Sequence, residues 1–371
     1  APIRPGDTDV KVILTALPTP TAQISVFVFE DSQPINNVPD LPQEQGLANF
    51  EIVLVEAGGR FGAAGGPVTQ DAFGDLVVNS ALDGVDDPGL EATRGRIVTN
   101  EFGVAVIKNL PPAKYGLTVR QPLSTNVWVQ TSTIEGSKTI DAWVKADEPP
   151  YFTEFGPAGH HADFGFVRMM DGSQDNNGDS APDLNGTATI SGTVVSTHMS
   201  RPPSYEFSAG RPFPDCYVGL NDAAGLGVYA QKCADDSSFS IANVPDGTYS
   251  LAVWDANLDI VFGTASVLVE NNTSVNLGEV GVFDWFGHLR GSVFYDDDED
   301  GFRDPGEAGA DLTEMGIFSA VTLRWRDGTV YDAGPTEFNG DYEFAEVFPF
   351  FSWLVAEVDF GAPLKATGMT A

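Results

Sequence analysis

The sequence predicts an all-β protein built from tandem antiparallel β-sandwiches, and three observations indicate it. The 371-residue chain lacks long stretches with the 3.6-residue period of an amphipathic helix. It has instead short runs of valine, isoleucine, phenylalanine and tyrosine, separated by glycine, proline, asparagine and aspartate. These runs recur in the same order three times, which is typical of repeated modules.

Each predicted unit begins with a strand, and these three strands read ISVFVFED, ISGTVVS and LRGSVFYDD. A middle strand follows: ANFEIVLVE, PDCYVGLND and AVTLRWRDG in the three units. Each unit then has a polar turn, an alternating strand, a tight turn that contains proline, and another alternating strand. Because proline restricts that turn, we expect the last two strands to pair as an antiparallel hairpin with a defined register.

The repeats divide the chain into five segments. These are an N-terminal extension at residues 1–19, module 1 at 20–168, an acidic linker at 169–186, module 2 at 187–282 and module 3 at 283–371. The short joins between modules suggest a semi-rigid rod. The chain begins abruptly at APIRPGDTDV, as a matured or excised segment would, and we expect a longer parent protein.

The charge of the chain excludes one class of partner and favours another. There are 53 acidic residues against 19 basic ones, for a formal net charge of -34. Binding of nucleic acid requires basic patches that neutralise phosphate, and none is visible. The acidic excess favours cations as partners, or a salty extracellular environment that screens self-repulsion. No apolar run approaches the roughly 20 residues that a membrane span requires.

The stretch YDDDEDGFRDPGEAG in module 3 holds the most concentrated negative charge and follows the spacing of a calcium-binding loop. Three aspartates stand at positions 1, 3 and 5, a glycine at 6, and a glutamate at 12 closes the ligand shell. The resulting calcium ligands are Asp296, Asp298, Asp300, Asp304 and Glu307, with the backbone carbonyl of Phe302 at position 7. This spacing would surround one hard cation with six to eight oxygens.

A solvated acidic loop is the alternative interpretation of this stretch, since the whole chain is acidic. The flanking residues read as a strand and an irregular segment, so a calcium loop here would lack the paired helices of a sensor. We therefore expect a structural clamp. At extracellular calcium concentrations and the ~10⁻⁴ M affinity of such modules, binding would stabilise the fold by about 1–2 kcal/mol.

Two other stretches are weaker metal candidates. DGVDDPGLE, with Asp83, Asp87 and Glu91, mirrors DGFRDPGE of module 3 but has one extra residue before the glutamate. Asn79 and Ala81 fall at positions 1 and 3, so a loop that has lost its ion is the alternative interpretation there. In the linker, DGSQDNNGD lacks a glutamate at position 12, and a polar linker without an ion is the alternative there. Its candidate ligands are Asp171, Asp175, Asn177 and Asp179.

The two cysteines, Cys216 and Cys233, each lie beside a β-like run, in DCYVGL and YAQKCADD. Cross-strand pairing as a disulfide is plausible, and a buried free pair is the alternative. A disulfide would contribute about 3 kcal/mol in the chain-entropy model. It would also indicate an oxidising, secreted or cell-surface location.

The third unit resembles the SdrD B-like domains of large bacterial surface proteins. The resemblance rests on the order GxVxxD, GxxDPGExG and GDYxF. The second unit, with ISGTVV and FSIANVPDGTYSLAV, is similar to carboxypeptidase-regulatory-like, transthyretin-like modules, which are related to CNA-B domains; the first looks like a longer variant of the same plan. The resemblance implies Ig-like or transthyretin-like sandwiches that act as spacers and are often tightened by calcium.

No catalytic constellation can be assembled from the sequence, so we expect a non-catalytic protein. The favoured function is a calcium-stiffened structural or spacer segment that presents or assembles other domains or subunits. One alternative is an accessory segment of a very large secreted enzyme, because WLVAEVDFGAPLKATGMTA faintly resembles non-catalytic parts of multicopper-oxidase-type proteins. Another is a carbohydrate-binding or adhesive module, in which Trp128, Trp143, Trp285 and Trp353 would stack on glycan rather than pack in cores.

Overall fold

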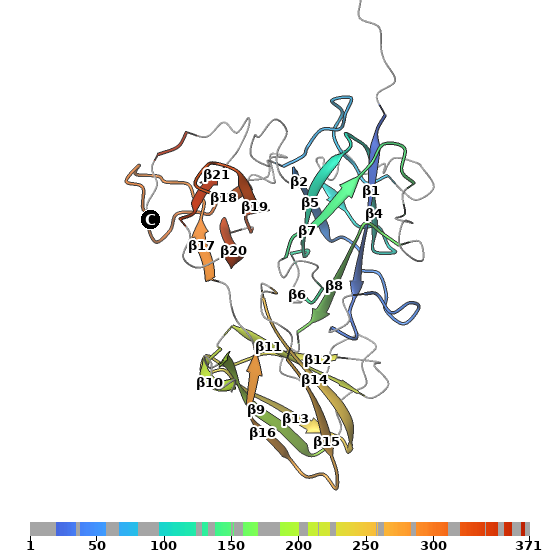
Figure 1. Cartoon of the computed structure of the whole chain (residues 1–371), viewed down its shortest axis with the longest axis vertical. Coiled ribbons are helices and arrows are strands. Elements are labelled where there is room, and N and C mark those ends of the chain that lie inside the picture. The colour runs from blue at the N-terminus through green and yellow to red at the C-terminus, as the bar shows by residue number, and fades with distance from the viewer. Residues whose placement is uncertain are drawn as a thin grey trace, which may run out of the picture.

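The computed structural model shows an all-β chain with 21 strands among its described residues. The structure describes residues 20–34, 38–56, 67–80, 96–123, 128–132, 138–149, 151, 159–169, 186–199, 207–213, 215–222, 228–256, 258, 263–282, 287–310, 320–337, 339–347, 352–357 and 365–367. None of these residues belongs to a helix long and apolar enough to cross a membrane. The strands fall into three groups, which we call modules 1, 2 and 3 (Figure 1).

Module 1 contains two four-stranded sheets. The first sheet has the order β4-β1-β8-β6 and the second has the order β3-β2-β5-β7. The strands of the first sheet are β1 (Ala22–Glu30), β4 (Val104–Leu110), β6 (Trp128–Gln130) and β8 (Ala162–Arg168). Those of the second are β2 (Glu51–Glu56), β3 (Ile97–Val98), β5 (Ala113–Arg120) and β7 (Ile140–Val144).

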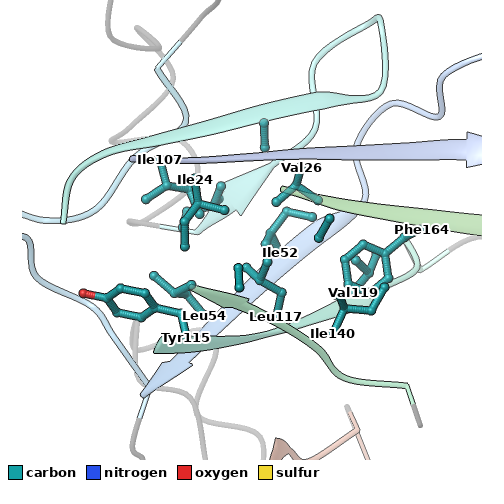
Figure 2. Close-up of a cluster of buried hydrophobic side chains, with 14 of the residues drawn as sticks. Ile24, Val26, Ile52, Leu54, Ile107, Tyr115, Leu117, Val119, Ile140 and Phe164 are labelled. Carbon is teal, nitrogen blue, oxygen red and sulfur yellow. The ribbon is translucent and has the colours of Figure 1, made fainter. Parts of the chain in front are cut away.

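The two sheets of module 1 face each other across a hydrophobic core (Figure 2). Ile24 and Ile107 come from the first sheet, while Ile52 and Leu117 come from the second, and all four are at most 1% exposed. Side chains alternate across a strand, so every second residue of each run enters this core. Burial of each such side chain contributes roughly 1.5–3 kcal/mol.

Module 2 repeats the two-sheet plan. In one sheet β9 (Ala188–Met199) pairs with β10 (Phe207–Pro212), β13 (Ser238–Val244) and β16 (Val275–Val282). The other has the order β12-β11-β14-β15, with β11 (Cys216–Asp222), β12 (Val228–Lys232), β14 (Gly247–Asp255) and β15 (Gly263–Val269). Cys216 and Cys233 form the predicted disulfide, with their Cα atoms 5.4 Å apart.

Module 3 has a smaller described core. One sheet pairs β17 (Gly287–Ser292) with β20 (Asp341–Val347), and the other has the order β19-β18-β21. The strands of the second sheet are β18 (Ala320–Arg324), β19 (Val330–Pro335) and β21 (Leu354–Glu357). Val321 and Leu323 from one sheet pack with Phe344 and Val347 from the other.

The predicted all-β fold with antiparallel sheets is confirmed, and modules 1 and 2 each add one parallel strand pair. In module 1 the first strand, β1, pairs in parallel with the last strand, β8. In module 2 the first strand, β9, likewise pairs in parallel with the last strand, β16. The remaining strand pairs are antiparallel, including β1 with β4 and β2 with β5. Each of these modules therefore places its first and last strands side by side.

The predicted hairpins are wrong, because the proline-containing turn carries the chain from one sheet to the other. Strands β4 and β5 lie in different sheets, and so do β13 and β14, and β20 and β21. In module 1, Asn109 adopts a left-handed conformation (φ 61°), and the hydroxyl of Tyr115 donates to the Pro111 carbonyl at 2.7 Å. An asparagine tolerates this conformation better than most residues, so the turn redirects the second strand across the core.

The same turn recurs in module 2. Asn243 has φ 58°, and the Tyr249 hydroxyl donates to the Pro245 carbonyl at 2.9 Å. The order Asn-x-Pro-x-x-x-Tyr is thus shared by both turns. In both, the tyrosine ring is buried while its hydroxyl holds the turn, a role similar to that of the tyrosine corner in other β-sandwiches.

The three modules do not form a rod, because module 3 lies beside module 1 (Figure 1). Val53 and Val55 of β2 pack with Ala333 of β19 in one hydrophobic cluster. Nearby, the Arg120 guanidinium of module 1 donates to the Thr336 carbonyl of module 3. The rod expectation failed because residues on the outer face of β2 are as apolar as core residues and are buried by a neighbouring module.

Modules 1 and 2 share a hydrophobic cluster centred on Trp254, whose side chain is fully buried. Val129 and Val167 of module 1 belong to this cluster, and Met169, just after β8, forms a parallel bridge with Ala230 of β12. The two modules therefore meet through an apolar contact of the kind found inside a domain, not through a solvated joint.

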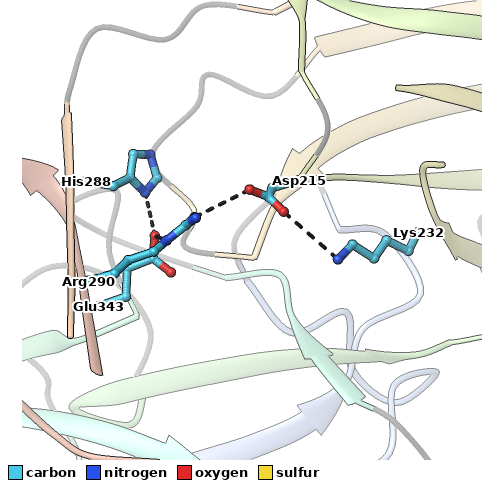
Figure 3. A network of polar contacts seen from close by, with 5 residues as sticks. All are labelled: Asp215, Lys232, His288, Arg290 and Glu343. Atoms are coloured by element: carbon cyan, nitrogen blue, oxygen red, sulfur yellow. Dashed lines mark hydrogen bonds and ion pairs between the residues drawn. The ribbon is translucent and has the colours of Figure 1, made fainter. Parts of the chain in front are cut away.

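A polar network joins modules 2 and 3 (Figure 3). On module 3, Arg290 Nε donates to Glu343 Oε1 at 2.6 Å, and His288 Nδ1 lies 2.6 Å from the same oxygen. Arg290 Nη2 reaches Asp215 of module 2 at 3.4 Å, and Lys232 Nζ lies 4.0 Å from Asp215. Arg290 thus connects a carboxylate of its own module with one of module 2.

We expect Tyr249→Phe to lower the free energy of unfolding by about 1 kcal/mol, because the ring still packs while its hydrogen bond to Pro245 is lost. Tyr115→Phe should have the same effect in module 1. Urea unfolding followed by circular dichroism measures both. Tyr295→Phe, which follows the bridge residue Phe294 outside the named strands of module 3, is the control. An equal loss in all three variants would contradict a special role for the turn.

Candidate calcium site

The acidic stretch of module 3 forms a closed loop directly after β17. Its two ends are joined by a bridge between Phe294 and Gly309 and by a hydrogen bond from the Tyr295 N–H to the Ala308 carbonyl at 2.9 Å. A Cβ on Gly309 would lie 1.6 Å from the Asn339 carbonyl oxygen, so only glycine allows this close approach. The loop therefore begins and ends on the body of module 3.

Backbone N–H groups orient the carboxylates of this loop. Asp296 accepts from the N–H of Asp300 at 3.1 Å and from that of Gly301 at 3.0 Å. Glu307 accepts from the N–H of Asp297 at 2.8 Å and from that of Asp304 at 2.9 Å. The first and last predicted ligands are thus held from both sides of the loop.

Five predicted ligand side chains converge in two overlapping groups. Asp296, Asp298 and Glu307 form one group; Asp298, Asp300 and Asp304 form the other. In each group the possible ligand oxygens lie within 4.8 Å of one another. Asp298 belongs to both groups and is therefore at the centre of the arrangement. The Phe302 side chain is 59% exposed, which agrees with a predicted contribution through its backbone carbonyl alone.

The pKa values in the loop reflect this crowding. The hydrogen bond from the Asp300 backbone lowers the pKa of Asp298, but desolvation and the charges of Asp300, Asp304 and Glu307 outweigh it and raise that pKa above its ordinary value. The pKa of Asp296 is lowered, chiefly by a hydrogen bond from the Thr367 side chain. Repulsion is therefore concentrated at Asp298, where a cation would relieve it most.

The sequence analysis missed the residues that anchor the loop from outside. Arg303 Nη1 donates to Asp341 at 2.9 Å, and its Nη2 donates to the Asn339 carbonyl at 3.1 Å. Lys365 Nζ lies 3.2 Å from Glu299, which belongs to neither carboxylate group. These partners are at least 36 residues from the loop residues they contact, so no local spacing could indicate them.

The weaker metal candidates all fall outside the described residues. This applies to Asp83, Asp87 and Glu91, and to Asp171, Asp175, Asn177 and Asp179. Among the histidines, His160 stacks on Phe27 at a ring distance of 5.3 Å, and burial lowers the pKa of its imidazole to about 4. His161 Nδ1 accepts from the Ser25 N–H at 3.1 Å. Both rings are thus engaged in packing or backbone contacts of module 1.

The tryptophans do not form an exposed platform in the described part of the chain. Trp128 is 7% exposed, whereas Trp143 is 71% exposed but stands alone on edge strand β7. Trp353 belongs to a cluster in which its ring is tilted 35° to Trp325 and 47° to Tyr331. Trp285 lies outside the described residues. The arrangement of the described tryptophan rings therefore does not support the predicted stacking of a sugar on a flat aromatic surface.

Module 1 contains a structural counterpart of the calcium loop that the sequence analysis did not identify. A bridge between Phe29 and Gly46 joins the two sides of a loop of which residues 31–34 and 38–44 are described, as the bridge between Phe294 and Gly309 does in module 3. Glu44 accepts from the Ser32 and Asp40 N–H groups at 2.7 and 2.6 Å. This repeats the two contacts that Glu307 accepts from Asp297 and Asp304. The only sequence signal is an aspartate after the first strand and a glutamate two residues before a glycine.

The loop of module 1 differs from that of module 3 in the burial of its first aspartate. Asp31, which corresponds to Asp296, is 2% exposed and accepts hydrogen bonds from the Thr131 hydroxyl and the Gln33 N–H. Burial raises the pKa of Asp31 to about 7, although the Thr131 hydrogen bond lowers it; nearby Glu44 and Asp40 raise it further. Burial and the Thr131 hydroxyl thus act together on Asp31, whereas the module 3 groups that share Asp298 consist of exposed or half-buried carboxylates.

Comparisons with known proteins leave the family open. No family model and no curated protein matches the chain. Among solved structures, the TIE protein of Bacillus anthracis is 10% identical, with 92% of this chain and 46% of that chain covered and a TM-score of 0.21. This chain thus spans less than half of that protein.

Two pilin structures are similar to this chain at comparable sequence identity and TM-score. The minor pilin GBS52 of Streptococcus agalactiae is 10% identical, with 70% of this chain and 95% of that chain covered and a TM-score of 0.21. The shaft pilin SpaA of Lactobacillus rhamnosus GG is 8% identical, with 71% and 97% covered and a TM-score of 0.22. At these scores the likenesses carry no functional argument, and the all-β fold rests on the strands of this chain.

We expect Asp298→Asn to raise the melting temperature of the metal-free protein in low salt, because it removes the carboxylate that experiences most repulsion. The gain should shrink in 1 M NaCl, where the Debye length is about 3 Å. Differential scanning calorimetry in EDTA measures both. A lower melting temperature in low salt would show that Asp298 stabilises the empty loop instead.

We expect Asp31→Asn to stabilise the protein more at pH 8 than at pH 5. The folded-state pKa of Asp31 lies above its ordinary value, so the fold retains a proton that the unfolded chain loses, and stability falls as pH rises from about 4 to about 7. The difference between the two pH values should be about 2–3 kcal/mol. Urea unfolding at pH 5 and pH 8 tests this, and an equal effect at both would contradict it.

Proposed function

We propose that the chain is a non-catalytic structural segment of a secreted or surface-displayed bacterial protein, and that Ca²⁺ stiffens it by binding the acidic loop of module 3. In this proposal the ion is held by Asp296, Asp298, Asp300, Asp304 and Glu307, with the Phe302 carbonyl. The segment presents or assembles neighbouring domains of a longer chain or other subunits.

The observation that carries the proposal is the convergence of five carboxylates in two overlapping groups that share Asp298. Hard cations such as Ca²⁺ prefer carboxylate and carbonyl oxygens. The comparison between modules adds support, because the equivalent loop of module 1 buries one aspartate against Thr131, whereas module 3 gathers exposed charges. The disulfide between Cys216 and Cys233 favours an oxidising location.

Calcium would act on the whole segment through the anchors of the loop. Arg303 connects the loop to Asp341 at the start of β20, and Thr336, in the turn before β20, accepts from Arg120 of module 1. A rigid loop would therefore support the part of module 3 that contacts module 1. The hydrophobic clusters shared between modules support a rigid arrangement of the three modules rather than a flexible linker.

We expect millimolar Ca²⁺ to raise the melting temperature of module 3 by about 5–10 °C relative to EDTA, from the stabilisation of about 1–2 kcal/mol expected of an extracellular site. Calorimetry of the whole chain measures this shift. Calcium should also slow tryptic cleavage after Arg303, which lies within the loop. Glu307→Gln and Asp298→Asn should abolish both effects.

Glu299→Gln is the matched control, because Glu299 lies in the same loop but contacts Lys365 instead of the carboxylate groups. It should keep the full calcium response. Isothermal titration calorimetry measures binding directly. If wild type takes up no Ca²⁺, or if Glu299→Gln loses the response together with Asp298→Asn, the acidic loop is a solvated loop and the calcium proposal fails.

A further inference from the structure

A cavity of about 690 Å³ lies where the three modules meet. Module 1 contributes Trp128 and Gln130, module 2 contributes Tyr217, and module 3 contributes Tyr342 and Glu343. Cavities of 300–1,000 Å³ at domain interfaces are typical binding sites for small ligands. This one depends on the packing of all three modules, since no module supplies its whole wall.

The charge of this wall differs from that of the rest of the chain. The chain carries 53 acidic and 19 basic residues. The wall has three of each kind: Arg120, Lys138, Arg290, Glu337, Asp341 and Glu343. The cavity is therefore neutral within a strongly negative molecule.

The charged side chains of the wall already form ion pairs or hydrogen bonds within the protein. Arg290 bonds to Glu343 at 2.6 Å (Figure 3), Asp341 bonds to Arg303 at 2.9 Å, and Lys138 lies 3.9 Å from Glu337. An ionic ligand would have to compete with these pairs, and an apolar ligand would strip water from them. A neutral ligand rich in hydrogen-bonding groups avoids both penalties.

The other wall residues suit such a ligand. Gln121 Oε1 accepts from the Trp128 N–H at 2.8 Å and Gln130 Nε2 donates to the Ser132 carbonyl at 2.9 Å, so the other polar atom of each amide is the one that serves a ligand. The Thr118 and Thr139 hydroxyls bond to each other at 3.3 Å and would exchange that bond for bonds to a ligand. Adjacent donors and acceptors of this kind match neighbouring sugar hydroxyls, each of which can donate and accept. The half-buried rings of Tyr217 and Tyr342 offer apolar faces for the C–H surfaces of a sugar.

We propose that this three-module cavity binds a neutral saccharide, such as the end of a glycan chain. The inference goes beyond the structural role above and does not depend on calcium. The site is pre-organised, because Tyr217 follows the disulfide-bonded Cys216 and stacks on buried Trp254 at a ring distance of 6.0 Å. Its concave form differs from a flat aromatic platform, which the described tryptophans do not provide.

The experiment titrates the full chain with neutral oligosaccharides (maltohexaose, cellohexaose, xylohexaose and chitohexaose) and with anionic hexagalacturonate, by calorimetry and saturation-transfer NMR. The blocking variant is Gly334→Trp. Gly334 lines the cavity, and a Cβ there meets no atom within 4 Å, so the side chain can enter without a backbone clash. Gly159→Trp is the matched control, since a Cβ at Gly159 also meets nothing and this residue is not in the wall.

We expect at least one neutral oligosaccharide to bind wild type and Gly159→Trp equally, and Gly334→Trp at least tenfold more weakly. Trp143→Ala, which removes the exposed tryptophan of β7, should bind like wild type. Circular dichroism and melting curves establish that each variant is folded. No binding of any neutral sugar at millimolar concentration overturns the proposal. So does tighter binding of hexagalacturonate, or equal binding by a folded Gly334→Trp.

Discussion

The sandwiches of modules 1 and 2 depend on the turn that carries the chain from one sheet to the other. Because of this turn, β4 and β5 lie in different sheets, and the two sheets close over the core that contains Ile24 and Leu117. The left-handed asparagine sets the direction of the turn, and the tyrosine hydroxyl, four residues after the proline, holds it. A single neutral hydrogen bond contributes only about 1 kcal/mol. Its importance lies in selecting a sandwich over a hairpin.

Modules 1 and 3 have similar acidic loops but differ in the surroundings of the loop carboxylates. Both place an aspartate after the first strand and a glutamate before the closing glycine, and both use backbone N–H groups to hold the glutamate. Module 1 buries its aspartate beside Thr131. Module 3 has more carboxylates close together, and they are exposed or half-buried. Their mutual repulsion favours the binding of a counter-ion. The two loops therefore share a scaffold but differ in the number and the burial of their carboxylates.

Most runs that the sequence analysis predicted as strands are strands in the structure. They could be predicted because the alternation of apolar residues indicates which side chains enter a core. Alternation does not report which sheet a strand joins, so β13 and β14 were wrongly paired. The convergence of Asp296 with Glu307 follows from local spacing and could be predicted. The contact of Arg303 with Asp341 could not, and neither could the burial of Val53 by Ala333, because both depend on how distant segments pack.

The parallel pairing of first and last strands has a mechanical consequence. In module 1 the chain enters at the start of β1 and leaves at the end of β8, and these points lie at opposite ends of one strand pair. A pulling force applied through the chain would slide β1 along β8, so that their backbone hydrogen bonds are loaded together instead of breaking one after another. Module 2 has the same geometry in β9 and β16. Tension along the chain therefore meets its greatest resistance at the strands where each module begins and ends.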